Sequence, residues 1–303
     1  MIQGLEHEAE VQADAHARHE RRLWHGPAGH LLHLGVVFLS LTRLTHLIGL
    51  LARQAALDHP HLVEVDVPVR DLPPALAGLR IGHLSDFHVG VHVRPADARR
   101  AVALLQTAAP DLIVMTGDLV DHRPRDVVPA AQAMAGLAAP LGVYGVLGNH
   151  DHRAGGARLL AALAEHAPNL RMLVNSACRV PLPAGELWVA GLDSVYLGLA
   201  DPAAALAAVP PGAPCLLLSH EPDAADHLPR PVTLTLGGHA HGGQIRVAGR
   251  PLLLPPLARR YHTGLNQSAS GPVYTSRGVG WTGIPLRLAC PAEVAVLRLT
   301  PAE

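Results

Sequence analysis

The amino-acid sequence predicts an α/β protein in which buried strands alternate with helices. Apolar runs of about five residues recur along the chain, and such runs are typical of strands that are buried on both faces. Longer amphipathic patterns, which indicate helices, separate most of these runs. Near the end of the chain two strand patterns follow without a helix, so part of the sheet should be antiparallel. No linker interrupts residues 60–303, which we therefore interpret as one domain.

The first element is a half-exposed strand over residues 63–69. Valine alternates there with polar residues and with Pro68, and because proline has no N–H to donate, this strand should lie at a sheet edge. Further strands are expected at residues 79–84, 112–116, 143–147, 187–192, 215–219, 232–236, 273–276 and 294–299. Helices are expected at residues 96–108, 127–138, 157–166 and 202–209.

The composition fits a globular protein with a well-buried core. The chain has 303 residues, of which 49% are hydrophobic and 16% charged, and this excludes a disordered chain. Lys and Arg number 24 and Asp and Glu 25, so no strong field would attract nucleic acid, and we expect no nucleic-acid binding. Cys178, Cys215 and Cys290 lie far apart, which argues against a disulfide framework or a structural zinc site and predicts three buried free thiols.

Residues 31–52 form an apolar segment behind a polar tail. The segment is long enough to cross a bilayer, but Arg43 in its middle costs roughly 3 kcal/mol, whereas each large apolar residue contributes about −0.3 to −0.6 kcal/mol. Arg43 and His46 share one helical face while Leu44 and Ile48 share the other, which favours a helix lying in a membrane surface. A single membrane span, and a helix packed on the domain or in a dimer, are the alternatives. We expect a cytoplasmic protein at the inner face of the cell membrane.

Polar side chains follow five of the predicted strands at the point where each strand ends. They are Asp86 and His88 after the strand at 79–84, Asp118 after 112–116, Asn149, His150 and Asp151 after 143–147, His220 after 215–219, and His239 and His241 after 232–236. Asp86 and His88 are two residues apart, so on extended backbone they would point to the same side. In open α/β sheets ligands bind beyond the carboxyl ends of strands, so we expect all these side chains to meet at one edge.

Oxygen and nitrogen donors together suit a divalent cation of the manganese, iron or zinc group. The set is too large for one ion and suits two cations that share a carboxylate, as in hydrolytic two-metal sites. Any single member of the set is explained equally well as a turn or capping residue. Turn or capping roles do not explain why all five strand ends carry such residues in this order.

The order of these motifs resembles the calcineurin-like metallophosphoesterase superfamily. The resemblance covers residues 80–241 and consists of Asp-x-His, Gly-Asp, Gly-Asn-His-Asp, His and Gly-His-x-His. It implies two packed mixed β-sheets flanked by helices, with residues 59–303 as the catalytic domain and residues 1–58 as an N-terminal tail and membrane-associating helix. It also implies that Asp86, His88 and His241 hold one metal, that Asn149, His220 and His239 hold the other, and that Asp118 bridges them. By the same resemblance His150 contacts the phosphoryl group and protonates the leaving group, and Asp151 orients His150.

The chain departs from the protein Ser/Thr phosphatases of this superfamily, which carry Gly-Asp-x-x-Asp-Arg-Gly where this chain has His122 after Asp121. The segments around residues 238–244 and 274–278 look like a bacterial branch of membrane-associated phosphoesterases. That resemblance implies hydrolysis of phosphodiesters or of the pyrophosphate of a lipid-linked nucleotide sugar, by attack of a hydroxide shared between two metals. A phosphomonoesterase or nucleotidase, and a scaffold without catalysis, are the alternatives. Arg153 and Arg277 are open between substrate contact and a structural role.

Overall fold

The computed structural model describes residues 60–302. The tail and the apolar segment that we predicted within residues 1–58 lie outside the described residues, so their membrane association stays a prediction. Within the described part of the chain, no helix combines the length and the apolar character needed to traverse a bilayer.

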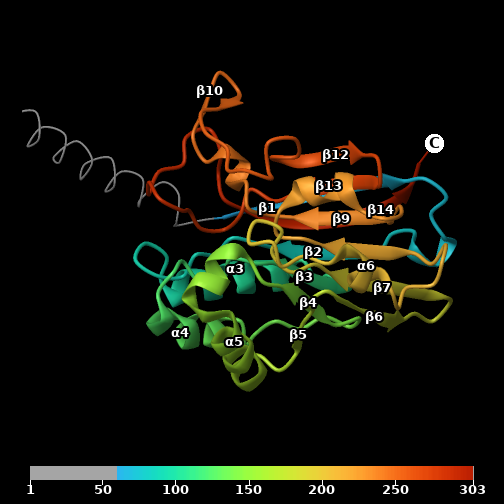
Figure 1. Cartoon of the computed structure of the whole chain (residues 1–303), viewed down its shortest axis with the longest axis horizontal. Coiled ribbons are helices and arrows are strands. Elements are labelled where there is room, and N and C mark those ends of the chain that lie inside the picture. Colours follow the sequence, from blue (N-terminus) through green and yellow to red (C-terminus); the bar gives the residue numbers. More distant parts are fainter. Residues whose placement is uncertain (1–59, 303) are drawn as a thin grey trace, which may run out of the picture. The chain divides into compact units, whose positions relative to one another are not determined.

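Two six-stranded sheets form the centre of the described domain (Figure 1). The first contains, in spatial order, β1 (His61–Val69), β14 (Glu293–Pro301), β2 (Arg80–Leu84), β3 (Leu112–Thr116), β4 (Val143–Val146) and β5 (Leu170–Met172). The second contains β12 (Gly264–Ser268), β13 (Gly271–Thr275), β9 (Leu234–Gly237), β8 (Cys215–Leu218), β7 (Glu186–Gly191) and β6 (Ser176–Pro181). Strands β2 to β5 and β7 to β9 run parallel, while β14 is antiparallel to β2, and β6 and β12 are antiparallel to their neighbours. Both sheets are therefore mixed, as predicted.

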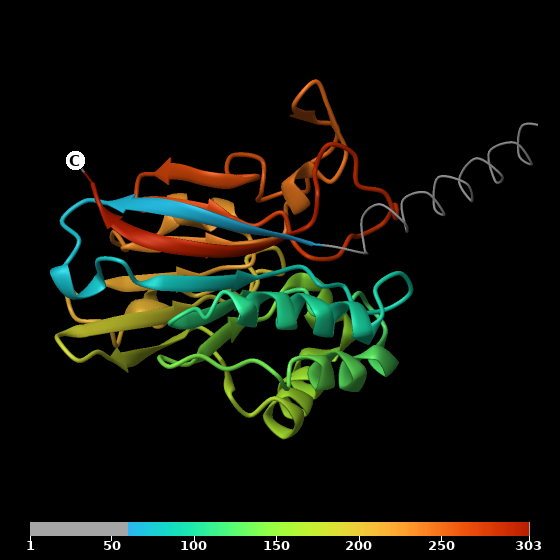
Figure 2. The ribbon, with the colours of Figure 1, turned by 180° about the vertical axis from the view of Figure 1, so that it is seen from behind.

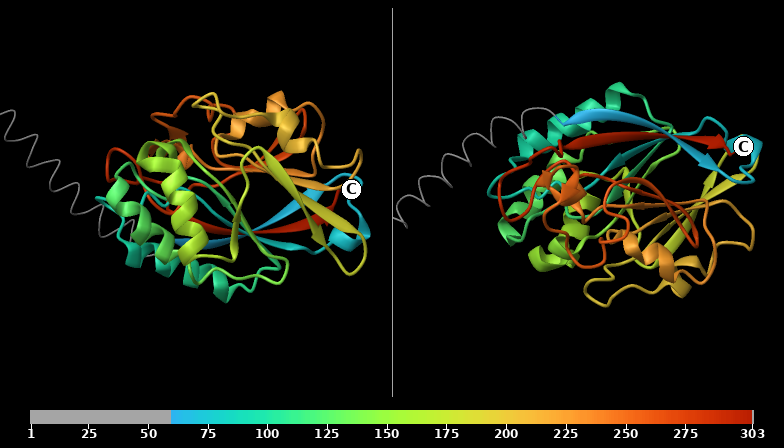
Figure 3. Two further views of the ribbon diagram at one scale, coloured as in Figure 1. Left: turned by 60° about the horizontal axis from the view of Figure 1, so that its bottom comes forward. Right: turned by 90° about the horizontal axis from the view of Figure 1, so that it is seen from above.

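The two sheets pack face to face, and helices cover their outer faces. Side chains from both sheets, such as Ile81 and Val114 of the first and Leu216 of the second, share one buried cluster. On the outer face of the first sheet lie α3 (Pro95–Thr107), α4 (Val127–Ala133) and α5 (Asn149–His166), which Figure 3 shows grouped together. The short helix α6 (Pro202–Leu206) and the turns after β8 pack on the second sheet. Each fully buried Leu, Ile or Val stabilises this arrangement by about 1.5–3 kcal/mol.

Strand β14 shows how the layers are built from the sequence. Its side chains alternate, so that Val294 and Val296 face the helices while Ala295 and Leu297 face the second sheet. Figure 2 shows β14 beside β1, its parallel partner from the other end of the domain. Because β1 pairs on this side only, it is an edge strand, which confirms the prediction made from Pro68.

Helices α4, α5 and α6 differ from their predicted bounds, and α6 ends at Leu206 rather than at residue 209. Helix α4 ends at Ala133, earlier than predicted, and tight turns follow in which the N–H groups of Met134 and Leu137 donate to carbonyls three residues back. Helix α5 begins at Asn149, earlier than predicted, and Gly155 interrupts it with a positive φ of 113°.

The remaining strands escaped prediction because they lie at edges or in loops. Strands β6 and β12 are half-exposed and rich in small or polar residues, and β5 has three residues. The two-residue strands β10 (Arg246–Val247) and β11 (Arg250–Pro251) form a separate hairpin. All three cysteines are buried and free, as expected.

Candidate metal centre

The predicted ligands follow β2, β3, β4, β8 and β9 and meet at one edge of the two sheets. Five of them have a positive φ, namely Asp86 (53°), His88 (49°), Asp118 (54°), His239 (65°) and His241 (48°). Non-glycine residues rarely adopt this left-handed conformation, and where they do it clusters at functional sites. The expectation that Asp86 and His88 share an extended backbone was therefore wrong, because β2 ends at Leu84 and the chain turns.

Hydrogen bonds between neighbouring loops hold this unusual backbone. The N–H of Asp86 donates to the carbonyl of Gly117 at 3.0 Å, and the N–H of His88 donates to the carbonyl of Asp118 at 2.9 Å. Glycine is required where these loops touch. A Cβ atom on Gly148 would collide with Oδ1 of Asp118, and one on Gly238 would collide with the Asp86 carboxylate. The glycines of the sequence motifs thus allow backbone and carboxylate to approach closely.

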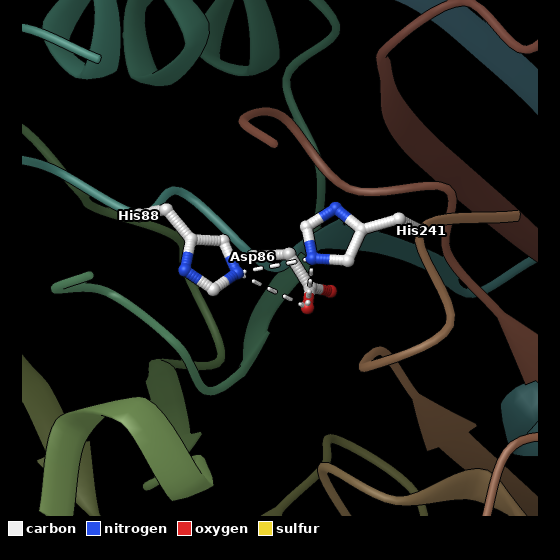
Figure 4. A group of neighbouring side chains, drawn as sticks. All are labelled: Asp86, His88 and His241. Carbon is white, nitrogen blue, oxygen red and sulfur yellow. Dashed lines mark hydrogen bonds and ion pairs between the residues drawn. The ribbon is translucent and has the colours of Figure 1, made fainter. Parts of the chain in front are cut away.

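Asp86, His88 and His241 form a first group of metal-competent side chains (Figure 4). All three are buried, and their ligand atoms lie within 4.8 Å of one another. Nε2 of His241 is 3.4 Å from Oδ1 of Asp86 and 3.0 Å from Nε2 of His88. Nε2 of His88 is 3.9 Å from the same Asp86 oxygen. The three donors converge on one small volume, as the sequence predicted.

Asp118, His220 and His239 form a second buried group. Oδ2 of Asp118 is 3.1 Å from Nε2 of His220, and Nδ1 of His239 is 3.2 Å from that same nitrogen. Oδ2 of Asp118 also lies 3.5 Å from Nε2 of His88 in the first group. One carboxylate oxygen therefore stands between the two groups.

The outer nitrogens of two histidines fix which nitrogen faces the centre. His220 donates from Nδ1 to the carbonyl of Thr116 at 2.7 Å, which leaves Nε2 directed at Asp118. His239 donates from Nε2 to the carbonyl of Pro256 at 3.0 Å, which leaves Nδ1 inside. Metal-ligating histidines generally use their second nitrogen in this way. When these rings are neutral, the atoms that face the centre are nitrogens and carboxylate oxygens with free electron pairs. Such a donor set fits divalent cations.

Burial and charge set the protonation states in the centre. Burial lowers the pKa of His239 to about 3 and that of His241 well below its ordinary value, so both are neutral, as a ligand must be. Burial raises the pKa of Asp86 to about 6. Burial also acts to raise the pKa of Asp118, but the protonated His220 ring outweighs it and holds that pKa well below its usual range, while Asp118 in turn raises the pKa of His220. A negative charge is therefore maintained at Asp118, between the two groups. A cation would have to displace the Nε2 proton of His220 to bind there.

Asn149 and His150 begin helix α5 at the same edge. Asn149 is buried, and its Oδ1 has no hydrogen-bond partner among the described residues, although a buried polar atom normally has one. The N–H of His150 donates to Oδ1 of Asp118 at 2.8 Å. Asn149 thus lies next to the carboxylate that stands between the groups, with an oxygen that a cation would satisfy.

Asp121 contacts the ring of His150, and sequence analysis missed it. Nδ1 of His150 is 2.5 Å from the Asp121 carbonyl and 3.5 Å from its Oδ1. Burial acts to lower the pKa of His150, but the hydrogen bonds of Asp121 and the charge of Asp118 prevail and raise it. The carboxylate of Asp151 accepts instead from the N–H groups of Gly148 and Val120, at 2.9 and 3.0 Å. Asp151 is thus placed to orient His150 only through the backbone. The Gly-Asp-x-x-Asp spacing that ends at Asp121 was the available signal.

The two arginines that were left open have different surroundings. Nη1 of Arg153 is 3.4 Å from Nε2 of His150, and its guanidinium lies 5.7 Å from the ring centroid of Tyr196. Arg277 donates from Nε to Glu293 at 2.6 Å. Arg153 therefore lies beside the centre, whereas Arg277 is tied to the first residue of β14.

Comparisons with known proteins identify the family and relatives of this chain. The family model described as calcineurin-like phosphoesterase matches residues 79–243. The metallophosphoesterase YkuE of Bacillus subtilis is 32% identical over 251 residues, which are 79% of this chain and 86% of that protein. A transmembrane protein with metallophosphoesterase domain from Danio rerio is 33% identical over 282 residues, 88% of this chain but only 63% of that protein. The phosphodiesterase YaeI of Escherichia coli is 32% identical over 234 residues, 74% of this chain and 83% of that protein.

Proposed function

Because the chain belongs to the calcineurin-like phosphoesterase family and is a metal-dependent phosphoester hydrolase, we propose that it cleaves phosphodiesters with two divalent cations. Asp86, His88 and His241 would hold one cation and Asn149, His220 and His239 the other. The observation that carries this proposal is Oδ2 of Asp118, which lies 3.5 Å from a nitrogen of the first group and 3.1 Å from a nitrogen of the second. A carboxylate in that place would serve both ions.

Bound cations would lower the pKa of a water molecule and neutralise charge on the phosphoryl oxygens. The chain's own contribution to the chemistry centres on His150. Its Nδ1–H donates to the Asp121 carbonyl, so Nε2 is the nitrogen available to substrate. Asp121 raises the pKa of His150 against the effect of burial, which keeps the imidazolium populated to higher pH. We propose that this imidazolium donates its Nε2 proton to the departing oxygen, as a general acid.

Arg153 supplies positive charge at the same place. Its Nη1 is 3.4 Å from Nε2 of His150, where an anionic phosphoryl group would lie. The Tyr196 ring, 5.7 Å from the guanidinium, limits where that guanidinium can move. We therefore propose that Arg153 orients the substrate, whereas Arg277 anchors β14 through Glu293. The phosphodiesterase name of the Escherichia coli relative supports a diester as substrate.

The test compares Asp118→Asn with Asp71→Asn, which makes the same change at an exposed turn after β1. Metal content is measured on protein purified without chelator, and turnover on a chromogenic phosphodiester and the matching monoester. We expect about two equivalents of transition metal per wild-type chain, and Asp118→Asn should lose both metal and turnover while Asp71→Asn loses neither. A wild-type chain that is fully active with one equivalent under metal excess would overturn the two-cation proposal. Faster turnover of the monoester would favour a phosphomonoesterase.

A further inference from the structure

Two loops beside the metal centre expose a concentration of large aliphatic side chains. One loop contains the β10–β11 hairpin and the residues after it, and the other precedes β14. We call their exposed side chains the apolar rim, which consists of Val247, Leu252, Leu253, Ile284 and Leu288. Leu253 is 81% exposed, Leu252 65% and Ile284 60%. Exposed apolar patches of this kind mark interaction sites.

Hydrogen bonds join the two loops into one surface. The N–H of Arg246 donates to the carbonyl of Leu288 at 2.9 Å, and the N–H of Leu288 donates to the carbonyl of Gln244 at 3.0 Å. The Gln244 side chain also donates to the carbonyl of Ile284 at 2.8 Å. Figure 1 shows the β10 hairpin projecting from the body of the domain. The apolar rim is therefore a built feature of the fold with its side chains held outward.

The same loops are part of the wall of the metal centre. The first loop begins directly after His241, and Pro256 near its end accepts the hydrogen bond from Nε2 of His239. The buried guanidinium of Arg287, in the second loop, lies 3.4 Å from Nδ1 of His241. Whatever binds the apolar rim is thus held next to the metal centre.

The two loops that carry the apolar rim contain arginines but no aspartate or glutamate. Arg260 and Arg277 are ion-paired with Asp226 and Glu293, and Arg287 is buried, which leaves Arg246, Arg250 and Arg259 in the first loop. Arg250 is exposed at the hairpin. Arg246, beside it, binds the carbonyls of Gly242 and Gly249, and within the described residues it forms no ion pair. Protruding aliphatic side chains bordered by arginines match the boundary of a bilayer that carries anionic headgroups.

We propose that the apolar rim inserts into a bilayer surface containing anionic lipid and presents the metal centre to phosphoesters held in that surface. The inference rests on the proposed function and gives a docking surface to the lipid-linked phosphoesters that the sequence resemblance implied. The contact is separate from the membrane association predicted for residues 31–52, since it is made by the described domain itself. Nucleic acid is the less favoured occupant, because the exposed rim is aliphatic and offers no aromatic face for base stacking.

A local probe on the full chain tests the contact. Leu253→Cys is labelled with an environment-sensitive fluorophore, and the three native cysteines are buried. The control label is at Ala184→Cys, in the exposed turn before β7 and so at the far end of the strands from the metal centre. With phosphatidylglycerol-containing vesicles we expect a blue shift at residue 253 and none at 184. No shift at 253 on protein that sediments with these vesicles would overturn the inference, as would an equal shift with single-stranded DNA.

A kinetic comparison separates this inference from the proposed function. For Leu252→Glu/Leu253→Glu, the ratio of turnover on a phosphodiester in vesicles to turnover on a soluble diester should fall about tenfold or more relative to wild type. The matched control is Leu265→Glu on β12, where the ratio should hold. An unchanged ratio in the double variant would overturn the apolar rim as a docking surface. If wild type cleaves neither diester while the label at 253 shifts, the proposed function fails and the lipid contact stands.

Discussion

Replacing His150 with alanine should separate metal binding from chemistry in this centre. The ring is outside both three-residue groups that would hold the cations, and the main-chain N–H that binds Asp118 is unaffected by the change. His150→Ala should therefore keep a near wild-type metal content. What the variant loses is the Nε2 proton that would be donated to the leaving oxygen.

The size of the loss follows from the role of that proton. General acid catalysis is typically worth about 10²–10⁴-fold, which corresponds to roughly 3–5 kcal/mol of transition-state stabilisation. The full loss should appear with an alkyl ester, whose leaving alkoxide needs the proton. A nitrophenolate leaves without much help, so the loss with a nitrophenyl ester should be far smaller.

The assay measures kcat for both esters on metal-saturated wild type and His150→Ala, together with metal content. Asp121→Asn serves as the matched comparison, because it keeps the ring and removes the carboxylate whose hydrogen bond raises the pKa of His150. The alkaline limb of the pH–kcat profile of Asp121→Asn should move to lower pH, while the activity of this variant at acidic pH is retained.

Two outcomes would refute this reasoning. His88, Asp121 and His150 themselves form a third group whose ligand atoms lie within 4.8 Å of one another. If His150→Ala strips metal and excess metal restores activity, the ring is a ligand in that group rather than an acid. If alkyl-ester turnover survives with normal metal content, the proton comes from elsewhere.

Two further predictions concern other parts of the chain. Deleting residues 1–52 should leave a folded, active domain with much weaker co-sedimentation with vesicles; aggregation of the shortened protein would place that segment in a core or dimer contact instead. His83 is fully buried, and burial lowers its pKa to about 3. The neutral ring's contribution to stability is thus present above about pH 6.5 and is lost as the pH falls below it. Between pH 8 and pH 5 this should cost about 2 kcal/mol, and His83→Gln should lack that loss in urea unfolding of metal-loaded protein. Equal pH dependence in both proteins would count against it.

The central strands could be predicted because a strand that is buried on both faces consists of consecutive apolar residues. Residues 112–115 and 215–218 are uninterrupted apolar runs, and in the structure they lie in β3 and β8. Edge strands such as β12 carry no such pattern, since Leu265 is its only large apolar residue and the others are small or polar. The apolar rim was missed for a related reason: Leu252 and Leu253 lie among glycines and prolines with no period to mark them.

The sequence predicted which residues gather at the site better than it predicted their geometry. Strand ends rich in Gly, Asp and His indicated which residues gather, and the structure brings the predicted metal ligands to one edge. The partner of the His150 ring depended instead on a three-residue spacing within one loop, from Asp118 to Asp121. The left-handed backbone of the ligands had no signal in the sequence, because hydrogen bonds between loops that are distant along the chain hold it in place.

The five left-handed ligand residues bear on how the protein would respond to its cations. Such a conformation costs roughly 1–2 kcal/mol at each non-glycine residue, so five of them oppose folding by an amount comparable to the net stability of a whole domain. Carboxylates and imidazoles crowded into one buried volume oppose it further. Ions that bind only the folded state would offset both costs by mass action, so the melting temperature becomes a function of the free metal concentration. Metal supply would then govern how long the enzyme persists in a cell as well as how fast it works.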